Sequence, residues 1–109
     1  MTARKKWIAG TLVPKGALFV DKGAADALGS GKSLLPAGVT RLEGSFDRGD
    51  AVVIKNGDGA ELGRGLVAYD DNEARRLLGR KSSEIEAILG YGGDPELIHR
   101  DDMVLNRKS

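Results

Sequence analysis

The sequence predicts a mostly β domain with short helices, an α+β fold of about six or seven short strands and about three short helices. Short apolar runs alternate with glycine, proline and acidic turn residues along the whole chain. The 109 residues include 16 glycines, which permit the sharp turns of a small β architecture. A chain this short can hide so many strand edges only by curling them into a closed or nearly closed barrel. The length and the absence of a linker indicate a single domain.

The composition excludes several classes of site. The chain has no cysteine, which rules out disulfides, thiolate zinc sites and cysteine nucleophiles and is typical of a reducing, cytoplasmic location. It has one histidine, so a histidine-rich metal site is excluded, and we expect no metal. Seventeen basic and 16 acidic residues give a net charge of +1, which provides no global field for nucleic acid or anionic membrane. We expect no membrane association, because no apolar run is long enough to span a bilayer.

Seven segments carry the apolar, β-branched or alternating pattern of strands. They are residues 7–13, 17–20, 34–35, 39–42, 51–54, 62–69 and 96–105. The dipeptides Asn56-Gly57 and Asp58-Gly59 predict a tight hairpin between the fifth and sixth segments. In the sixth segment, Gly63 and Gly65 lack side chains at alternate positions, so we expect a sharp bend or a closely packed neighbouring backbone there.

Three short helices are expected from their start signals and apolar stripes. Asp21 is placed to cap the first helix, which should end at residues 29–31. Asp70 and Glu73 have the spacing of a capping box before the second helix. The pair Ser83 and Glu86 forms the same motif before the third.

The five residues after the first predicted helix resemble the start of a nucleotide-binding loop. They are Gly29, Ser30, Gly31, Lys32 and Ser33. The full Walker A pattern requires a glycine where this sequence has Asp26, whose charge would repel phosphates. That loop also follows a strand and opens a helix, whereas here a helix precedes it and Pro36 soon follows. We therefore interpret this stretch as the exit of a short helix into a strand.

Other polar features have a structural interpretation that we favour over a functional one. His99 lies near carboxylates, but no nucleophile is placed to use it as a base. The acidic pairs Asp70-Asp71 and Asp101-Asp102 lack the alternating spacing of a calcium loop. The basic cluster at residues 75–81 has acidic neighbours typical of a solvated helix face. Trp7 follows three basic residues, and we expect it to anchor a strand rather than to stack on a base.

Four segments resemble the pattern of a PUA domain, a small pseudo-barrel first recognised in pseudouridine synthases and archaeosine transglycosylases. They are VDKGAA at 20–25, KSLLPAGV at 32–39, GSFDRGDAV at 44–52 and GRGLV at 63–67. A more specific resemblance, over nearly the whole chain, is to the C-terminal PUA domain of bacterial glutamate 5-kinases (gamma-glutamyl kinases). It rests on KWIAG at 6–10, GRKSSEI at 79–85, ILGY at 88–91 and IHRDDMVL at 98–105, although that family more usually has asparagine and leucine at positions 102 and 103.

The resemblance implies a parent enzyme that uses ATP and magnesium to phosphorylate L-glutamate to L-glutamyl 5-phosphate, at the start of proline biosynthesis. The amino-acid kinase domain of that family lies N-terminal to the PUA domain and is too large for this chain. The chain alone is therefore expected to be a non-catalytic regulatory or assembly module with no cofactor. Its expected partners are the kinase domain and, through the parent, further copies. The start at Met1 suggests a piece excised from such a kinase, with a standalone gene product as the alternative.

Two other functions remain open. Relatives of this fold in RNA-modifying enzymes hold RNA along the first helix and the following loop, which implies weak RNA binding here. The candidate contacts for RNA or another anion are Gly29, Ser30, Gly31, Lys32, Ser33, Arg80 and Arg100. The other function is a structural surface that packs on the kinase domain, which predicts an exposed apolar patch. We expect residues 1–6 to be an N-terminal extension, 7–105 the domain and 106–109 a frayed tail.

Overall fold

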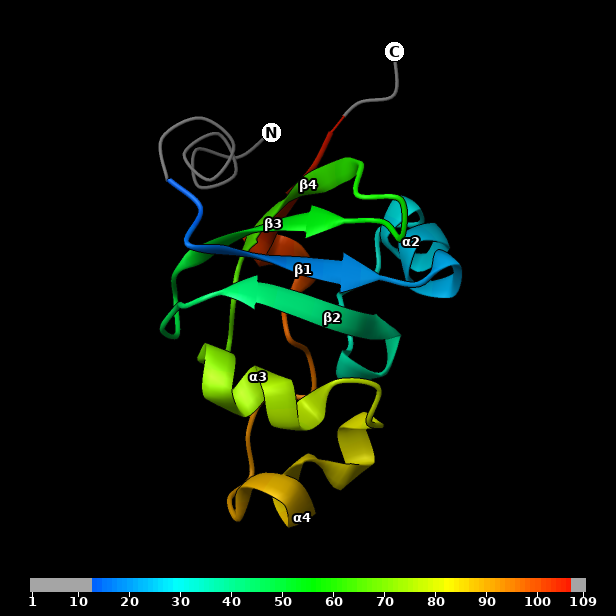
Figure 1. Ribbon diagram of the computed structural model, residues 1–109. Coiled ribbons are helices and arrows are strands. Elements are labelled where there is room, and N and C mark those ends of the chain that lie inside the picture. Colours follow the sequence, from blue (N-terminus) through cyan, green and yellow to red (C-terminus); the bar gives the residue numbers. More distant parts are fainter. Residues whose placement is uncertain (1–12, 107–109) are drawn as a thin grey trace.

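The computed structural model describes residues 13–106, which form a curled sheet with short helices beside it (Figure 1). The strands are β1 (Gly16–Val20), β2 (Val39–Gly44), β3 (Ala51–Lys55), β4 (Glu61–Leu66) and β5 (Met103–Leu105). The α-helices are α2 (Lys22–Gly29), α3 (Asp71–Leu77) and α4 (Ile85–Leu89). Three 3-10 turns complete the fold: η1 (Pro36–Gly38), η2 (Ser82–Glu84) and η3 (Arg100–Asp102). None of the helices in residues 13–106 is long and apolar enough to cross a membrane.

The five strands form one mixed sheet in the order β2-β1-β3-β4-β5. Strand β1 pairs with β2 antiparallel and with β3 parallel, so α2, η1 and β2 make up the connection between the two parallel strands. Strands β3 and β4 form the predicted antiparallel hairpin, and β5 adds to β4. Helix α2 lies beyond one end of the strands, whereas α3 and α4 lie next to the β2 edge (Figure 1). Different helices therefore lie at the strand ends and at the β2 edge of the sheet.

The core lies between the inner face of the sheet and the helices and loops that cover it. On β1 and β3 the inward positions are Leu18, Val20, Val52 and Ile54, each at most 1 % exposed. The remaining members of the cluster come from the helices and connections, and include Leu28, Leu34, Phe46, Tyr69, Leu77, Ile85, Leu97 and Ile98. No polar or charged residue of the described part is classed as buried. Burial of these apolar side chains is the main source of stability.

The outer face of the sheet carries an apolar side chain, Phe19, which charged side chains cover from solvent. Phe19 points to this face, opposite Arg41 on β2 and next to Lys55 on β3, and is only 5 % exposed. The Arg41 guanidinium lies 3.9 Å from the centre of the Phe19 ring, and the Lys55 ammonium lies 5.7 Å from it. Both cations are placed for favourable cation–π contact, and their stems exclude water from the ring.

The two glycines of β4 are required by close neighbours, as the sequence predicts. A Cβ atom at Gly63 would lie 2.8 Å from the Leu105 Cα atom, and one at Gly65 would lie 2.7 Å from the Ile98 Cγ2 atom. Because real Cβ atoms do not approach other atoms so closely, β5 and the segment before it can pack on β4 only where side chains are absent.

Two of the three predicted helix starts are confirmed. The Asp21 carboxylate accepts a hydrogen bond of 2.7 Å from the Ala24 amide at the start of α2. At α3 the capping box is complete, because Asp70 accepts from the Glu73 amide at 2.7 Å and Glu73 accepts from the Asp70 amide at 3.3 Å. These bonds satisfy amides that have no partner within a helix.

The capping box predicted for Ser83 and Glu86 is wrong. Residues 82–84 form the turn η2, and α4 begins only at Ile85, with no side-chain cap. The Ser82 hydroxyl instead donates to the Pro95 carbonyl oxygen at 2.7 Å, which draws this turn toward the loop that follows α4. Gly90 ends the helix in the left-handed conformation at φ 83°.

Several strands are shorter than predicted, although the α+β class is confirmed. The 34–35 segment forms only an isolated bridge, Leu34 with Ile98, because the chain enters η1 at Pro36. Strand β4 ends at Leu66 rather than at residue 69. Of the predicted strand 96–105, only Met103–Leu105 pairs in the sheet as a strand, because η3 interrupts the segment. The predicted strand 7–13 falls outside the described residues, except for Val13, which is not in a strand.

Candidate functional site

The loop after α2 is held by hydrogen bonds to the last turn of the helix. The Ser30 amide donates to the carbonyl oxygens of Asp26 and Ala27, and the Lys32 amide donates to that of Ala27 at 3.1 Å. Gly31 has φ +85°, which glycine adopts without strain. The loop is thus a helix C-terminal turn, and its amides point back into the helix rather than outward toward a ligand. This geometry agrees with the rejection of a nucleotide-binding loop.

An apolar hollow of about 310 Å³ lies between α2 and the loop that leads to η1. Its lining residues are Asp21, Ala24, Ala27, Lys32, Ser33, Leu34, Leu35, Ala37 and Gly38. Two of the predicted contact residues, Lys32 and Ser33, therefore lie on its rim. The Leu35 side chain is 46 % exposed, which leaves apolar surface open at the mouth of the hollow. A flat apolar group of a ligand could enter here with an anion beside Lys32.

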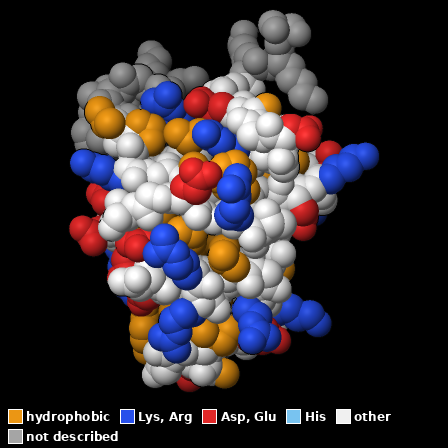
Figure 2. Space-filling view, in the orientation of Figure 1, with side chains coloured by type: hydrophobic (Ala, Val, Ile, Leu, Met, Phe, Trp, Pro, Cys, Tyr) orange, Lys and Arg blue, Asp and Glu red, His pale blue; other side chains and the backbone are white. Residues whose placement is uncertain are grey.

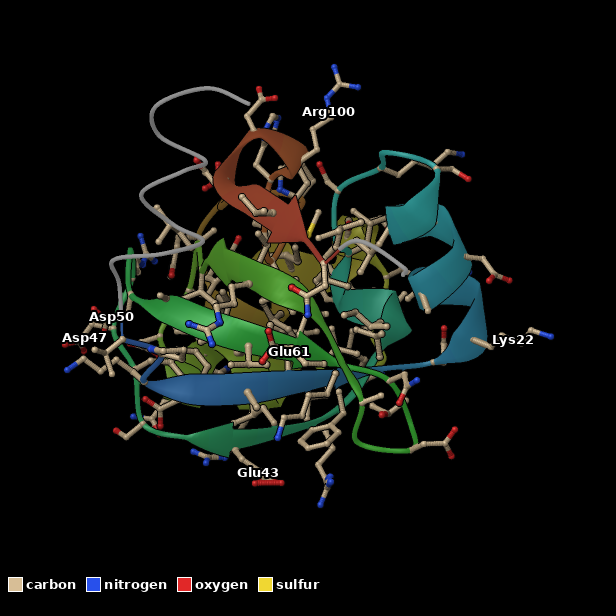
Figure 3. The ribbon with its side chains drawn as sticks, turned by 90° about the horizontal axis from the view of Figure 1, so that it is seen from above. Lys22, Glu43, Asp47, Asp50, Glu61 and Arg100 are labelled. Atoms are coloured by element: carbon tan, nitrogen blue, oxygen red, sulfur yellow. The ribbon has the colours of Figure 1, made fainter. Side chains whose placement is uncertain are left out.

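Arg100 joins this loop through its backbone. Its amide donates to the Ser33 hydroxyl oxygen at 2.8 Å, next to the bridge between Leu34 and Ile98. Arg100 and Gly31 together line a second hollow, of about 390 Å³. The Arg100 side chain projects outward from the segment before β5 (Figure 3). The structure therefore brings Arg100 to the predicted loop, although the two are far apart in the sequence.

Arg80 is not joined to this loop. No hydrogen bond or ion pair between described residues links its side chain to residues 29–33. The Arg80 guanidinium lies 3.9 Å from the Glu84 carboxylate in an exposed pair. Its neighbour Gly79 donates to the Pro36 carbonyl oxygen at 3.1 Å, which joins this segment to η1. Six of the seven candidate contacts thus lie in one region, whereas the Arg80 side chain is paired with Glu84.

Two other arginines of the basic cluster also have partners of their own. Arg75 pairs with Asp71 at 3.0 Å and Arg76 donates to the Ile88 carbonyl oxygen. Figure 2 shows Lys and Arg side chains spread from the sheet to the lower helices, with Asp and Glu side chains between several of them. This surface has the mixed charge of a solvated helix face.

His99 has a structural position. Its Nδ1 atom accepts a hydrogen bond of 3.1 Å from the Asp101 amide and so caps η3. The Asp101 carboxylate lies 3.5 Å from the same atom. No group of three or more potential metal-ligating side chains occurs among the described residues.

The most extensive polar network lies elsewhere, around Glu73, and its members other than the capping pair were not predicted. The Arg48 guanidinium donates to both Glu73 carboxylate oxygens, at 3.3 and 3.1 Å, and also to the Tyr91 hydroxyl oxygen. The Tyr91 hydroxyl in turn donates to Glu73. This network ties the loop before β3, the start of α3 and the loop after α4 to one another. The only sequence signal for it was the capping-box glutamate.

The network shifts the pKa values of its members. Burial raises the pKa of Glu73, but the hydrogen bonds from Arg48 and Tyr91 outweigh it, so the net shift is downward. The hydrogen bond to Glu73 raises the pKa of Arg48 and that of Tyr91. Burial raises the pKa of Tyr69, whose hydroxyl donates to the Asp94 carbonyl oxygen at 2.6 Å. All these shifts stabilise the protonation states present at neutral pH, which is typical of structural ion pairs rather than of a proton-transfer site.

Three large hydrophobic residues of the described part are exposed, and they come from three different segments of the sequence. The large hydrophobic residues exposed in residues 13–106 are Val13, Leu35 and Tyr91, which belong to the entry to β1, the loop before η1 and the loop after α4.

Comparison with known proteins places the chain in a family. The sequence pattern of the PUA domain matches residues 16–89. Glutamate 5-kinase of Paramagnetospirillum magneticum is 60 % identical over 104 residues, and that of Rhizobium etli (strain CIAT 652) is 61 % identical over 106 residues. The matches cover 95 % and 97 % of this chain but only 28 % and 27 % of the relatives, and they fall in the C-terminal portion.

Solved structures agree with this family. The crystal structure of a PUA domain protein (APE0525) from Aeropyrum pernix K1, a tartrate complex, has a TM-score of 0.58 at 28 % identity and covers 78 % of this chain and 41 % of its own. The archaeal box H/ACA sRNP Nop10-Cbf5 complex contains a chain with a TM-score of 0.53 at 20 % identity, over 79 % of this chain and 25 % of its own. The second likeness shows a shared fold, and the predicted PUA-like arrangement is thereby confirmed. The chain belongs to the PUA domain family.

Proposed function

We propose that this chain is the non-catalytic PUA module of a glutamate 5-kinase and acts there in regulation or assembly. The parent enzyme would transfer the γ-phosphoryl group of ATP to the side-chain carboxylate of L-glutamate, which gives L-glutamyl 5-phosphate for proline biosynthesis in the cytoplasm. The domain would extend over residues 7–105, with 1–6 as an extension and 106–109 as a tail.

The observation that carries the proposal is the unequal coverage of the relatives. About 60 % identity extends over nearly the whole chain, yet the chain spans only 27–28 % of glutamate 5-kinases. The remaining part of such an enzyme is large enough to hold a separate kinase domain, which would bind ATP, magnesium and glutamate. That domain would be the main partner of this module, and further copies of the parent would be indirect partners.

The geometry of the described residues supports a role without catalysis. The loop that resembles a phosphate-binding loop directs its amides into α2. The charged network around Glu73 is satisfied by internal hydrogen bonds. Phosphoryl transfer depends on groups that hold the ATP phosphates and magnesium, and we assign these to the rest of the parent.

The test measures ATP-dependent formation of L-glutamyl 5-phosphate by three samples. They are this chain alone, a complete glutamate 5-kinase, and the same kinase truncated before the residues that correspond to this chain. We expect no turnover from this chain and retained turnover from the truncated kinase, with altered proline inhibition or altered oligomeric mass. Turnover by this chain alone would contradict the proposal. A truncated kinase with unchanged turnover, inhibition and mass would remove the regulatory role.

A second candidate function is weak RNA binding, favoured by the position of Lys32 and Ser33 on the rim of the 310 Å³ hollow beside Arg100. Such a hollow could accept an unstacked base while Lys32 contacts a phosphate. The net charge of +1 would keep this binding weak and strongly dependent on salt.

Fluorescence anisotropy of a labelled structured RNA, titrated at increasing salt, tests this candidate. We expect Lys32→Ala to weaken binding about uniformly across RNA sequences and to lower the salt slope by roughly one phosphate contact, or about 0.7–0.9. Lys15→Ala is the matched control, because Lys15 is exposed in the segment before β1. Absence of binding at low ionic strength, or equal losses in both variants, would exclude RNA as a specific ligand of this loop.

A further inference from the structure

The 310 Å³ hollow beside α2 is a short groove with a defined direction, and we refer to it as the α2 groove. Its helical wall consists of Asp21, Ala24 and Ala27, which recur every three residues and therefore share one face of α2. Six residues of helix extend over about 9 Å. The opposite wall is formed by the loop after α2 and the turn η1, with the apolar residues Leu34, Leu35 and Ala37.

Two backbone hydrogen bonds show which residues lie at the ends of this groove. The Asp21 amide donates to the Gly38 carbonyl oxygen at 3.0 Å, which closes the groove at the start of α2. The Lys32 amide donates to the Ala27 carbonyl oxygen at 3.1 Å, which brings Lys32 to the last turn of the helix. Asp21 therefore lies at one end of the groove and Lys32 at the other, with the helical wall between them.

The two ends of the α2 groove carry opposite charges that are available to a ligand. Asp21 and Lys32 are exposed, and neither forms an ion pair with another residue of the described part. The Asp21 carboxylate caps α2 through Oδ1, which leaves its second oxygen to accept a further bond. The neighbouring cation Lys22 projects outward from the start of the helix (Figure 3). A ligand with a basic group near Asp21 and an acidic group near Lys32 is therefore complementary to the groove.

The surface between the charged ends is apolar and open. The Leu35 side chain is 46 % exposed, Ala37 is exposed, and Ala24 and Ala27 are half-buried. Because the helical wall has only methyl side chains between its ends, an apolar side chain of a ligand can lie close against the helix. Covering these groups removes apolar surface from water, which stabilises the bound state. The volume is at the lower limit of ligand pockets, about 300 Å³, so the groove fits a few side chains rather than a folded element.

The charge of Asp21 favours a peptide over a nucleic acid as the occupant of the whole groove. An RNA strand carries a phosphate at every nucleotide, so a strand along the groove would bring negative charge to the Asp21 carboxylate as well as to Lys32. A peptide can carry charges of opposite sign at its two ends. Three extended residues span about 10 Å, which matches the length of the helical wall.

We propose that the α2 groove binds a short peptide segment in which about three apolar residues lie between an acidic residue, which pairs with Lys32, and a basic residue, which pairs with Asp21. The occupant is a segment of the kinase domain of the parent, so this inference rests on the proposed function. It deepens that function, because it assigns the surface through which the module docks on its main partner.

Titration of the chain with model peptides, followed by nuclear magnetic resonance, tests the chemistry of the groove. Three blocked pentapeptides share the centre Leu-Ala-Leu and differ at their ends, which are Glu and Arg, two Glu, or two Arg. We expect the peptide with mixed ends to bind roughly two- to fivefold more tightly than either of the others and to shift the signals of Ala24, Ala27 and Leu35. Equal affinities for the three peptides, or shifts confined to other residues, would overturn the proposal.

Exchanging the charge at one end of the groove should change the preferred peptide. Lys32→Glu makes both ends acidic, so the peptide with two Arg ends should become the tightest ligand. Asp21→Asn keeps the helix cap and removes the charge, so it should abolish the preference for mixed ends over two Glu ends. Lys15→Glu is the matched control for charge, because Lys15 is exposed and does not line the groove. An order of affinities that Lys32→Glu leaves unchanged would overturn the proposal.

Filling the groove tests its shape. Ala27→Met places a long side chain in the groove and should weaken binding of the peptide with mixed ends by roughly tenfold or more. Ala25→Met is the matched control, since Ala25 lines a different hollow beside the same helix. Circular dichroism checks that both variants remain folded. Equal losses in the two variants would show a general effect on α2 and would overturn the proposal.

Hydrogen exchange tests the identity of the occupant. The probe is a complete glutamate 5-kinase that carries this sequence as its C-terminal part, compared with the chain alone. We expect the segment 32–38 to exchange on the order of tenfold more slowly in the complete kinase, and Ala27→Met, but not Ala25→Met, to remove this protection. Protection of the segment only after addition of structured RNA would assign the groove to RNA and overturn the proposal.

The same comparison separates this inference from the proposed function. Equal exchange in the chain and in a complete kinase whose truncation alters inhibition or oligomeric mass would overturn the α2 groove as the docking surface and leave the module's role intact. Turnover by the chain alone would contradict the proposed function, whatever the exchange shows.

Discussion

The Arg48 guanidinium donates two hydrogen bonds, of 3.3 and 3.1 Å, to the Glu73 carboxylate, which lies 25 residues further along the sequence. Glu73 also completes the capping box of α3 through the Asp70 amide. One carboxylate therefore fixes the start of a helix and the loop before β3 at the same time. The Glu73 side chain is 18 % exposed and that of Arg48 is 56 % exposed, so solvent screens part of this interaction.

The first prediction concerns pH. The pKa of Glu73 is lower in the folded state than its ordinary value of 4.5. Glu73 therefore contributes stability that is fully present above pH 4.5 and is lost as the pH falls through the lowered folded value. We expect Glu73→Gln to lower the free energy of unfolding by on the order of 1 kcal/mol at neutral pH. The difference from the wild type should disappear in acid.

Urea unfolding as a function of pH provides the measurement for Glu73. Glu84→Gln is the matched control, because Glu84 forms only an exposed pair with Arg80 at 3.9 Å. That variant should have the stability and acid dependence of the wild type. A constant difference between Glu73→Gln and the wild type at all pH values would contradict the assigned role of the carboxylate charge.

The second prediction concerns the loop after α4. Tyr69 is 1 % exposed and donates to the Asp94 carbonyl oxygen at 2.6 Å. We expect Tyr69→Phe to cost about 1 kcal/mol, because the ring packing remains while the hydrogen bond is lost. Thermal unfolding measures this loss. The variant should also increase hydrogen exchange in residues 91–95, and unchanged exchange there would show that the bond does not hold the loop.

The third prediction concerns the close packing of β5 on β4. We expect Gly63→Ala to destabilise the protein by roughly 1–3 kcal/mol, because the added methyl group would overlap the β5 backbone. Gly57→Ala is the control, since no atom lies within 4 Å of its Cβ position. Denaturant unfolding of the two variants, side by side, measures the difference. Equal stabilities would mean that β5 can move away from β4 at no cost.

The fourth prediction concerns the start of α2. Asp21→Ala removes the acceptor of the Ala24 amide and should cost about 1 kcal/mol. Asp26→Ala, on the exposed side of the same helix, should cost much less, because the Asp26 side chain makes no cap. Thermal unfolding of both variants provides the comparison. If Asp26→Ala is as destabilising as Asp21→Ala, the effect is one of charge and not of capping.

Local chemistry made much of the fold predictable. The helix caps made by Asp21, Asp70 and Glu73 are predictable, because a capping side chain bonds a residue three positions away. The close packing at Gly63 and Gly65 is predictable, because a strand position without a side chain lets another backbone approach closely. The Ser83 and Glu86 motif does not form, and the neighbouring Ser82 hydroxyl instead bonds the Pro95 carbonyl oxygen, 13 residues along the chain.

The sequence by itself determined the α+β class, the β3–β4 hairpin, the first two helix caps and the absence of a nucleotide-binding loop. Each depends on side chains that meet within a few residues or on composition. Only the tertiary structure decided that Arg100 lies beside Ser33 and that Arg48 and Tyr91 converge on Glu73. These relationships join segments 18 to 67 residues apart, and they follow from how the sheet curls and where the chain returns to it.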